Sequence, residues 1–324
     1  MNLLVSFRFE FEIIAKLCKI SSCAYTELYL SQRPPELHVQ PESALTFYRQ
    51  FVAQNRPVII RNGIKSWPAF RLWQNHDYLL KKLNPDKLVN VAVTPNGYAD
   101  AITDGKFVMP HEENMKFKDF VDIIENPSQH KGIHYIQRQN SNLSEEMNEL
   151  IEDISELQWA REAFGKDPDA VNFWMGDSRA VTSTHKDPYE NIYCVIKGQK
   201  DIILFPPTDV PWLPYKSYKQ AVFKKIDEGD SFSIEEIEDA PEIPWIAIDP
   251  LNPDLETYPD FQNAHPVRIT LKAGDVLYLP SLWFHHLRQS HGCIAVNFWY
   301  DMEFDGKFNY FNFVNEIKNL LDDT

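Results

Sequence analysis

The stretch "THKDPYENIYCVIKGQK" (residues 184–200) joins a strand-like apolar run to side chains that can carry chemistry. His185 and Asp187 are two positions apart, and on a strand such side chains point to the same side. One more histidine from another strand would complete two imidazoles and one carboxylate. That set binds one face of a non-haem Fe(II) ion and leaves its other positions open. The stretch therefore predicts a metal site built on strands.

A second stretch, "PSLWFHHL" (residues 280–287), offers His285 and His286 as the third ligand. Neighbouring residues of an extended segment point opposite ways, so only one of them can join the site. An HxD triplet alone is common and usually has no metal. The other histidines lie among charged or turn residues and are expected at the surface: His38, His76, His111, His130, His134, His265 and His291.

From residue 170 onward, short apolar runs alternate with Pro, Gly and Asp, which predicts an antiparallel sandwich or barrel. The string "VNFW" occurs at 171–174 and again at 296–299 and indicates two similar strand environments. Residues 208–264 are irregular and rich in proline. They are expected to form an insertion folded over the core, and long loops of this kind are often functional.

Both ends of the chain carry helical patterns. Ser43 is a candidate cap for a helix in "ESALTFYRQFVAQN" (residues 42–55). In "GKFNYFNFVNEIKNLLDDT" (residues 306–324), Phe308, Phe311, Val314, Ile317 and Leu321 share one face. This helix is expected either to pack on its own barrel or to pair with a second chain.

No Gly/Ser-rich linker divides the chain, so one catalytic barrel with additions is expected. The predicted division has three parts. Residues 1–130 form a helical and strand elaboration packed on the barrel, 131–302 form the catalytic core with the insertion 208–264, and 303–324 form a C-terminal helix.

Composition limits the partners. A formal net charge of −15 over 324 residues repels phosphate backbones and disfavours nucleic acid, whereas a basic protein segment would be attracted. The sequence contains no run of about 18 apolar residues, so no membrane span is predicted. The four cysteines form no CxxC pair, which disfavours a disulfide scaffold or zinc ribbon and favours a reducing compartment, the cytoplasm.

Lys200 opens the apolar run that follows His185 and Asp187. An Fe(II) oxygenase needs an oxidisable co-substrate, and 2-oxoglutarate has a distal carboxylate that favours a cation. A strand, a turn at Lys197 and Gly198, and a returning strand would bring Lys200 back towards the metal. A lysine at the start of a strand is more often solvated, so this position supports the site without proving it.

Together with "AGDVLYLPSLWFHHL" (273–287) and "AVNFWYD" (295–301), residues 184–200 resemble the JmjC-domain 2-oxoglutarate oxygenases, in the branch of small protein hydroxylases. The resemblance covers most of the chain. The stretches "RPVIIRN" (56–62), "VAVTPNGYAD" (91–100) and "DAVNFWMGD" (169–177) also resemble a lysyl hydroxylase of developmentally regulated GTP-binding proteins.

The resemblance implies a mainly β fold, a double-stranded β-helix or cupin-like jelly roll, with N-terminal and C-terminal helices. It implies Fe(II) as the metal, 2-oxoglutarate as co-substrate, and a lysyl residue of a GTP-binding protein as the target. The cytoplasm is the expected location and the nucleus a second one. A homodimer through the C-terminal helix, as in a similar asparaginyl hydroxylase, is an open alternative to packing on the barrel.

The family pattern carries over residue by residue without departure at the metal ligands or Lys200. It selects His285 over His286 and implies Lys200, Thr182 and Tyr135 at the distal carboxylate. It also implies Asn191 and Asn297 near the keto-acid end. The implied metal ligands are His185, Asp187 and His285.

Three other functions compete with hydroxylation. Histone lysine demethylation uses related chemistry, and although four scattered cysteines exclude zinc-binding reader domains, they do not exclude the reaction. A metal-dependent peptidase would need a general base such as Glu190 beside the ligands. A catalytically dead barrel used as a binding module is disfavoured, because such modules typically lose a ligand.

Overall fold

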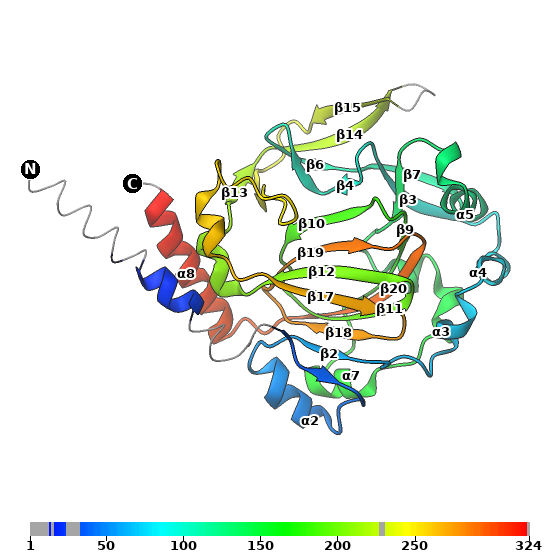
Figure 1. The fold of residues 1–324 in the computed structure, drawn as a ribbon. Helices are drawn as coiled ribbons and strands as arrows, with labels where there is room; N and C mark the ends of the chain where they lie inside the picture. Colours follow the sequence, from blue (N-terminus) through cyan, green and yellow to red (C-terminus); the bar gives the residue numbers. More distant parts are fainter. Residues whose placement is uncertain (1–12, 14–15, 24–32, 227–230, 323–324) are drawn as a thin grey trace, which may run out of the picture.

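Two packed β-sheets form the body of the molecule (Figure 1), and the computed structural model describes residues 13, 16–23, 33–226 and 231–322. The larger sheet has nine strands in the spatial order β1-β2-β18-β11-β20-β9-β8-β3-β7. The smaller sheet has five in the order β17-β12-β19-β10-β4.

The strands of the larger sheet are β1 (Glu36–Leu37), β2 (Val58–Ile60), β3 (Leu88–Thr94), β7 (His111–Lys116), β8 (Ile133–Ile136), β9 (Ala170–Gly176), β11 (Tyr189–Lys197), β18 (Val276–Leu279) and β20 (Cys293–Asp301). The strands of the smaller sheet are β4 (Tyr98–Ala99), β10 (Val181–His185), β12 (Gln199–Phe205), β17 (Val267–Lys272) and β19 (Phe284–Gln289).

Strand β11 is buried on both faces, which explains its almost unbroken apolar sequence. Tyr193 and Val195 point into the core between the two sheets, where they meet Ile202 of β12. Ile192 and Cys194 point the other way, into a second core beneath the helices. Because side chains alternate along β11, this one strand contributes to both hydrophobic cores.

Helices cover the outer face of the larger sheet, and Phe47, Phe120 and Trp159 bring them into its core. Ser43 caps α2 as predicted, because its side chain accepts from the backbone N–H of Thr46 at 3.1 Å. The helical elements on this side are α2 (Ala44–Phe47), η1 (Tyr48–Val52), α3 (Pro68–Leu72), α4 (His76–Leu83), α5 (Phe117–Glu125), η2 (Pro127–Gln129), α6 (Asn142–Glu145), η3 (Asn148–Asp153) and α7 (Gln158–Phe164).

The repeated string "VNFW" lies in two adjacent strands. β9 and β20 pair antiparallel, and Asn172 of the first copy lies directly opposite Asn297 of the second. The two copies of the string therefore lie side by side in paired strands of one sheet.

The insertion 208–264 is more regular than its sequence suggested. Its strands β14 (Gln220–Ile226) and β15 (Ser231–Glu236) join β5 (Ala101–Thr103) and β6 (Lys106–Met109) in a separate four-stranded sheet. β14 pairs parallel to β6, with Val222 opposite Met109. The expectation of an irregular loop is wrong, because a distant segment supplies the strand partners. The insertion also contains η4 (Pro207–Trp212), β13 (Tyr215–Tyr218), β16 (Ile243–Ile246) and η5 (Pro259–Asn263).

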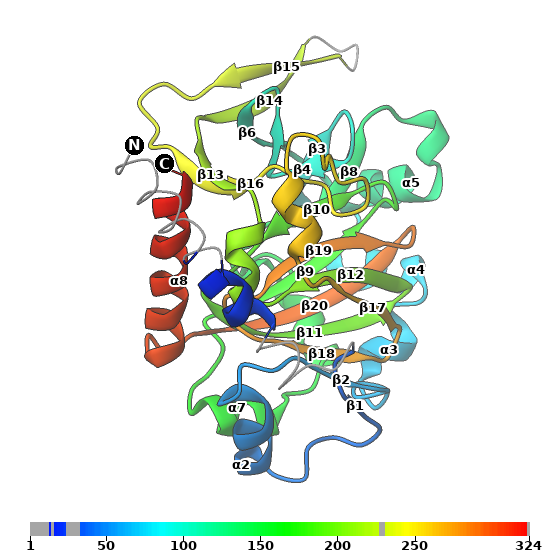
Figure 2. The same ribbon diagram turned by 60° about the vertical axis from the view of Figure 1, so that its left-hand side comes forward.

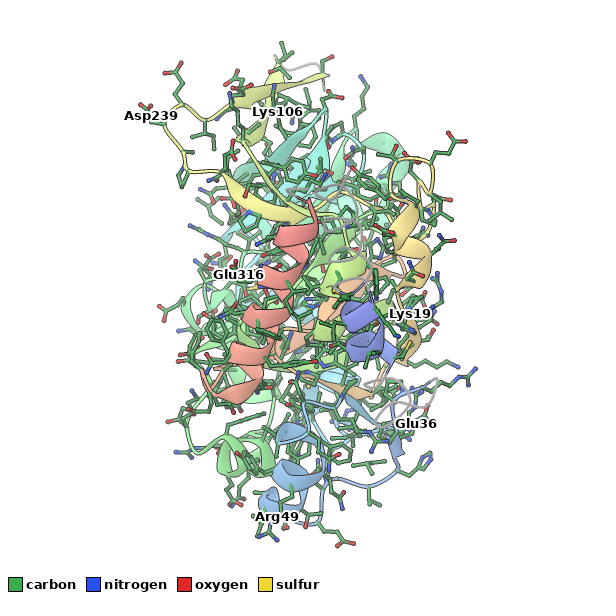
Figure 3. All side chains as sticks on the ribbon, turned by 90° about the vertical axis from the view of Figure 1, so that its left-hand side faces the viewer. Lys19, Glu36, Arg49, Lys106, Asp239 and Glu316 are labelled. Carbon is green, nitrogen blue, oxygen red and sulfur yellow. The ribbon has the colours of Figure 1, made fainter. Side chains whose placement is uncertain are left out.

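The C-terminal helix α8 (Gly306–Asp322) lies along one side of the barrel, next to the helical segment 16–23 (Figures 1 and 2). Phe311 and Val314 are buried in a core shared with η4 and β19, so the face predicted from the sequence packs on its own barrel. The side chain of Leu321 lies outside the described part. Figure 3 views this side directly, with Glu316 on α8 and Lys19 on the neighbouring segment.

The predicted fold class is confirmed: the chain is mainly β, built as a jelly roll with helical additions. The three-part division of the chain stays a prediction, and residues 1–12 and 24–32 of its first part lie outside the described residues. No described helix is long and apolar enough to span a membrane.

Candidate active site

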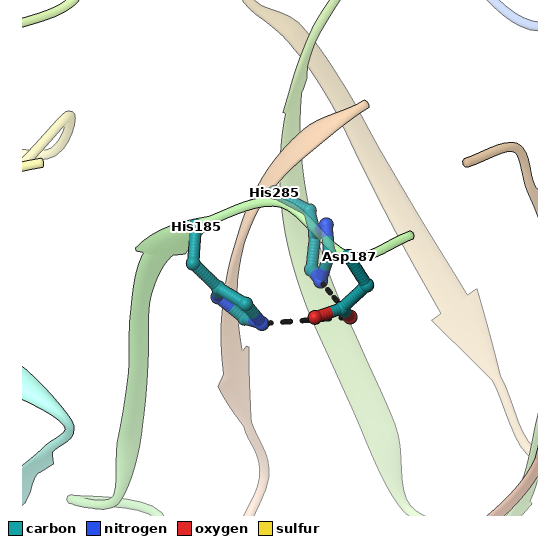
Figure 4. Close-up of side chains that lie close together, drawn as sticks. All are labelled: His185, Asp187 and His285. Carbon is teal, nitrogen blue, oxygen red and sulfur yellow. Dashed lines mark ion pairs between the residues drawn. The ribbon is translucent and has the colours of Figure 1, made fainter. Parts of the chain in front are cut away.

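Three side chains converge at one end of the smaller sheet. His185 ends β10, and His285 lies directly opposite it on β19. Asp187 follows two residues after His185, beyond the end of the strand rather than on it, so the bend of the chain, not strand alternation, aims it inward. All three offer ligand atoms within 4.8 Å of one another. Figure 4 shows both imidazoles directed at the carboxylate.

Backbone carbonyls fix the orientation of both imidazoles. Nδ1 of His185 donates to the carbonyl of Ser183 at 2.8 Å, and Nδ1 of His285 donates to that of Trp283 at 2.9 Å. The proton therefore sits on Nδ1, and Nε2 is left as an acceptor. These Nε2 atoms lie 3.7 Å and 3.5 Å from Oδ2 of Asp187. Two lone pairs and one carboxylate thus face the same point.

The protonation states suit a cation. Burial, with a smaller effect from His285, lowers the pKa of His185 to about 4. Burial alone would raise the pKa of Asp187, but the two histidines outweigh it and hold that pKa at about 2. At neutral pH His185 is neutral and Asp187 is ionised, as metal ligands must be.

His286 belongs to the other side of β19. Its Nε2 lies 3.8 Å from Oδ1 of Asp249 and is turned away from Asp187. Burial lowers the pKa of this imidazole to about 4. The choice that the sequence spacing left open between His285 and His286 is therefore decided by which face of the strand each one occupies.

An inner cavity extends from this group between the two sheets. Besides His185, Asp187 and His285, its lining includes Tyr135, Trp174, Thr182, Asn191 and Asn297. The two asparagines touch, with Nδ2 of Asn297 donating to Oδ1 of Asn191 at 3.2 Å. The indole of Trp174 holds the Asn297 amide from the other side at 2.8 Å. The structure thus gathers the residues that the family resemblance implied.

Lys200 lies behind Tyr135, one of the residues that line this cavity. It is only 2% exposed, and its Nζ donates to the hydroxyl of Tyr135 at 2.9 Å and to Oε1 of Gln289 at 2.5 Å. Burial lowers its pKa to about 8. It forms no ion pair with a described residue, although a buried ammonium normally requires an anion.

The turn that returns the chain to Lys200 depends on Gly198. This glycine has φ 77°, and a Cβ there would lie 2.4 Å from Oγ of Ser290. The turn links β11 of the larger sheet to β12 of the smaller sheet, so it crosses between the layers instead of forming a hairpin in one. Gln289 was missed from the sequence. The signal was its spacing, because His285 and Gln289 lie on the same face of β19.

An outer groove of about 800 Å³ opens on the other side of His185 and Asp187. Trp245 of β16 forms one wall, stacked on the His185 ring at 5.5 Å with an interplanar angle of 4°. The ring of Phe107 packs against Trp245 at 4.6 Å. The insertion and residues 88–116 together build this groove beside the His–Asp–His group. Sequence reasoning named neither wall residue.

Comparison with known proteins agrees with this architecture. The sequence model of a family described as a cupin-like domain matches residues 44–306. The human bifunctional peptidase and (3S)-lysyl hydroxylase JMJD7 is 47% identical over 279 residues, which are 86% of this chain and 87% of that protein. The chain belongs to the JmjC family of cupin-like oxygenases.

Two further JmjC relatives cover similar shares. Arabidopsis thaliana lysine-specific demethylase JMJ32 is 39% identical over 306 residues, 90% of this chain and 88% of that protein. Dictyostelium discoideum JmjC domain-containing protein E is 38% identical over 310 residues, 86% of this chain and 87% of that protein. The chain is therefore a 2-oxoglutarate-dependent oxygenase, and JmjC proteins in general depend on Fe(II) and 2-oxoglutarate.

In this JmjC oxygenase Glu190, the candidate base of a peptidase, faces away from the inner cavity. Its carboxylate accepts from the Tyr278 hydroxyl at 2.7 Å and from the Ser281 hydroxyl and backbone N–H at 2.9 and 3.1 Å. It also pairs with Lys307 at the start of α8. These contacts assign Glu190 to anchoring the C-terminal helix.

One prediction about the remaining histidines of this JmjC oxygenase is wrong. His134 is 4% exposed instead of lying at the surface. It belongs to β8 (Ile133–Ile136), all of whose residues are buried, so both faces of this strand are covered.

Proposed function

We propose that this JmjC oxygenase is an Fe(II)- and 2-oxoglutarate-dependent protein hydroxylase that acts on a lysyl residue. It uses O2, transfers one oxygen atom to the lysyl side chain, and releases succinate and CO2. The observation that carries the proposal is Lys200, a buried cation with no anion among the described residues. It donates to the Tyr135 hydroxyl beside the cavity that the His–Asp–His group also lines.

The residues fit the implied metal. In the proposal His185 and His285 ligate Fe(II) through Nε2, and Asp187 supplies the single negative charge. The carbonyls of Ser183 and Trp283 keep both imidazoles in the required tautomer. When bound, the iron and 2-oxoglutarate supply the oxidising chemistry of the family. The chain's own part is to hold the ligand set, bind the co-substrate and position the target C–H bond.

The polar groups in and beside the inner cavity also suit the co-substrate. We assign the distal carboxylate of 2-oxoglutarate to Lys200, Tyr135 and Thr182, and the keto-acid end to Asn191 and Asn297. A carboxylate there would remove the cost of an unpaired buried ammonium and gain a charge-assisted hydrogen bond. Trp174 supports this, because its bond to Asn297 fixes which way that amide faces.

The lysyl target rests on the relatives' names and on charge. The human relative is named as a lysyl hydroxylase, and the net charge of −15 suits a basic segment of a protein substrate. We propose a developmentally regulated GTP-binding protein as that substrate, met in the cytoplasm and also in the nucleus.

Mass spectrometry of intact peptides tests the proposal. A lysyl peptide from the candidate GTP-binding protein, incubated with the enzyme, Fe(II) and 2-oxoglutarate, should gain the mass of one oxygen atom. Its methylated form is run alongside, and the Asp187→Ala protein serves as the control. Loss of methyl from the methylated peptide, with no oxygen gained by the unmethylated one, would replace hydroxylation with demethylation.

Demethylation is the second candidate because the Arabidopsis relative is named a lysine-specific demethylase. Peptidase activity appears in the human relative's name, and peptide fragments in the same spectra would reveal it here. The position of Glu190 removes the base that the sequence offered for hydrolysis.

Self-association is a separate proposal. The predicted face of α8 is used within the chain, but Phe304 and Phe313 are each 60% exposed. We propose that these rings form the contact of a homodimer. Sedimentation at micromolar concentration should show a dimer that Phe313→Glu dissociates, with Glu316→Gln on the same helix as the control. A strict monomer removes the proposal.

A further inference from the structure

Asp100 lies where the chain leaves the barrel for the outer sheet. It separates β4 of the smaller sheet from β5 of the four-stranded sheet, and its backbone has φ 53°. Its carbonyl accepts from the Ser183 hydroxyl at 2.5 Å, and that hydroxyl accepts from the Trp245 indole at 2.9 Å. Trp245 in turn stacks on His185. A short chain of contacts therefore ties Asp100 to the His–Asp–His group.

Strand register brings a second carboxylate to the same wall. Ala92 of β3 lies opposite Glu112 on one side and opposite Tyr135 on the other. Residues directly opposite each other share a face of the sheet. Gln137 follows Tyr135 by two residues, and its side chain donates to Oδ2 of Asp100 at 3.3 Å. Asp100 and Glu112 both line the outer groove.

Neither carboxylate has a cationic partner within the part of the chain that the structure describes. Glu112 accepts only from the Asn90 amide at 3.3 Å. Burial and the charge of Glu112 raise the pKa of Asp100 to about 6, which reflects the lack of a compensating positive charge.

Two cations of the groove have partners elsewhere. The ammonium of Lys186 lies 4.9 Å from the centre of the Phe311 ring on α8, and Arg138 pairs with Glu146 at 3.4 Å. Lys224 lies on the β14 wall and is exposed to solvent. The groove thus keeps an acidic wall next to the aromatic side chains of Phe107 and Trp245.

We infer that Asp100, assisted by Glu112 at the rim, receives the ammonium group of the substrate lysine. The inference rests on the proposed function and names what selects its substrate. An ammonium offers three donors, and the aliphatic stem of lysine can lie along Trp245 and Phe107. With its end held by Asp100, the stem crosses the opening beside His185, so that a carbon of the stem is the part presented for oxidation.

Binding without turnover tests this inference. The full chain is loaded with Mn(II) and 2-oxoglutarate under argon and titrated calorimetrically with two synthetic peptides. One contains a single lysine, and the other contains norleucine, which lacks only the ammonium. The wild type should bind the lysyl peptide about tenfold more tightly or better, because a charge-assisted bond is lost with norleucine.

Substitutions locate the effect. Asp100→Asn should reduce the preference for lysine by about tenfold, and Asp100→Glu should restore part of it. Asparagine tolerates positive φ, so this variant keeps the backbone. The matched control is Asp104→Asn, which also replaces an aspartate with positive φ but lies on the β5–β6 turn outside the groove. Its preference should equal that of the wild type.

Equal binding of the two peptides by the wild type, or an unchanged preference in Asp100→Asn, would overturn the inference. Oxygen transfer is followed separately by mass spectrometry with Fe(II) and O2. If the preference depends on Asp100 but the lysyl peptide gains no oxygen, the ammonium site stands and the proposed reaction fails. If oxygen is gained but the preference for lysine does not depend on Asp100, the proposed reaction stands and the assignment of Asp100 is wrong.

Discussion

The inner cavity and the outer groove meet at His185 and Asp187 but are assembled differently. Most polar groups of the inner cavity come from the barrel's own ladder, and His185, Asp187, Asn191 and Lys200 lie within sixteen consecutive positions. The outer groove instead joins residues 88–116 to the insertion 208–264 through the parallel pairing of β6 and β14. One short stretch therefore supplies several polar groups in and beside the inner cavity, whereas the groove depends on long-range pairing.

The difference separates two tasks. The inner cavity is closely hydrogen-bonded, and backbone carbonyls hold its two imidazoles, as groups that must keep one geometry require. The outer groove is open and carries two carboxylates with no cationic partner among the described residues, so it is suited to an exchangeable partner. Substitutions in the inner cavity should therefore affect metal and co-substrate, and those in the groove should affect the peptide.

The largest effect is expected at the His–Asp–His group. Asp187→Ala removes the only anionic ligand and should reduce Fe(II) affinity by more than about a hundredfold, beyond what supporting residues usually cost. His286→Ala is the matched control, since that imidazole faces Asp249. Metal content after dialysis measures both. Loss of iron from His286→Ala with retention by His285→Ala would reverse the choice of histidine.

The next effect concerns the co-substrate. Lys200→Met keeps the length of the side chain and removes its charge, which is worth roughly 1.5–3 kcal/mol in a charge-assisted bond. The dissociation constant for 2-oxoglutarate should rise by about tenfold or more. Titration of the Mn(II)-loaded protein measures it, with Lys197→Met on the preceding turn as the control. An unchanged constant would remove Lys200 from the cavity's function.

The same residue predicts a dependence of stability on pH. An unfolded lysine has a pKa of about 10.4, whereas burial lowers that of Lys200 to about 8. Between these values the unfolded chain binds more protons, so stability rises with pH, and the full cost is present below pH 8. Lys200→Met should raise the free energy of unfolding at pH 7 by up to about 3 kcal/mol.

Denaturant unfolding from pH 7 to 10 checks this sign. The wild type should gain stability over that range relative to Lys200→Met. At pH 7, saturating 2-oxoglutarate should reduce the difference in free energy of unfolding between the two proteins. A Lys200→Met protein that is less stable than the wild type at pH 7 would mean that the bonds to Tyr135 and Gln289 outweigh the burial cost.

The smallest effect is expected in the outer groove. Trp245→Leu removes the ring stacked on His185 and the donor to Ser183 but leaves every proposed ligand in place. KM for a lysyl peptide should rise several-fold, by roughly 1 kcal/mol of lost stacking and hydrogen bonding. The dissociation constant for 2-oxoglutarate should change less. An equal rise in KM for the peptide and in the dissociation constant for 2-oxoglutarate would show that the two regions are not separable.

The same contrast explains what the sequence could reveal. The pair His185 and Asp187 and the turn at Gly198 are local in sequence, so the sequence alone could suggest His185, Asp187 and Lys200 as candidates. His285 could not be chosen from spacing alone, because which face of β19 points inward depends on its pairing with β10. Only the family resemblance chose it beforehand.

The outer groove could not be predicted from the sequence, for a physical reason. Asp100, Glu112 and Trp245 come from separate parts of the chain. The pairing of β14 with β6 joins the insertion to the earlier segment, and nothing in the proline-rich insertion predicts that partner. The burial of His134 and Glu190 could not be predicted from the sequence either. Their side chains are polar, which suggested exposure for His134 and catalysis for Glu190, but both are buried, and Glu190 pairs with Lys307 of α8.

Isotope incorporation tests the central claim most directly. The enzyme, Fe(II), 2-oxoglutarate and an unmethylated lysyl peptide are incubated under isotopically labelled dioxygen, and the peptide is fragmented in the mass spectrometer. The account predicts one labelled oxygen on a carbon of the lysyl side chain, formed with an equal amount of succinate and absent with the Asp187→Ala protein. A peptide that stays unlabelled while its methylated form loses methyl would contradict it.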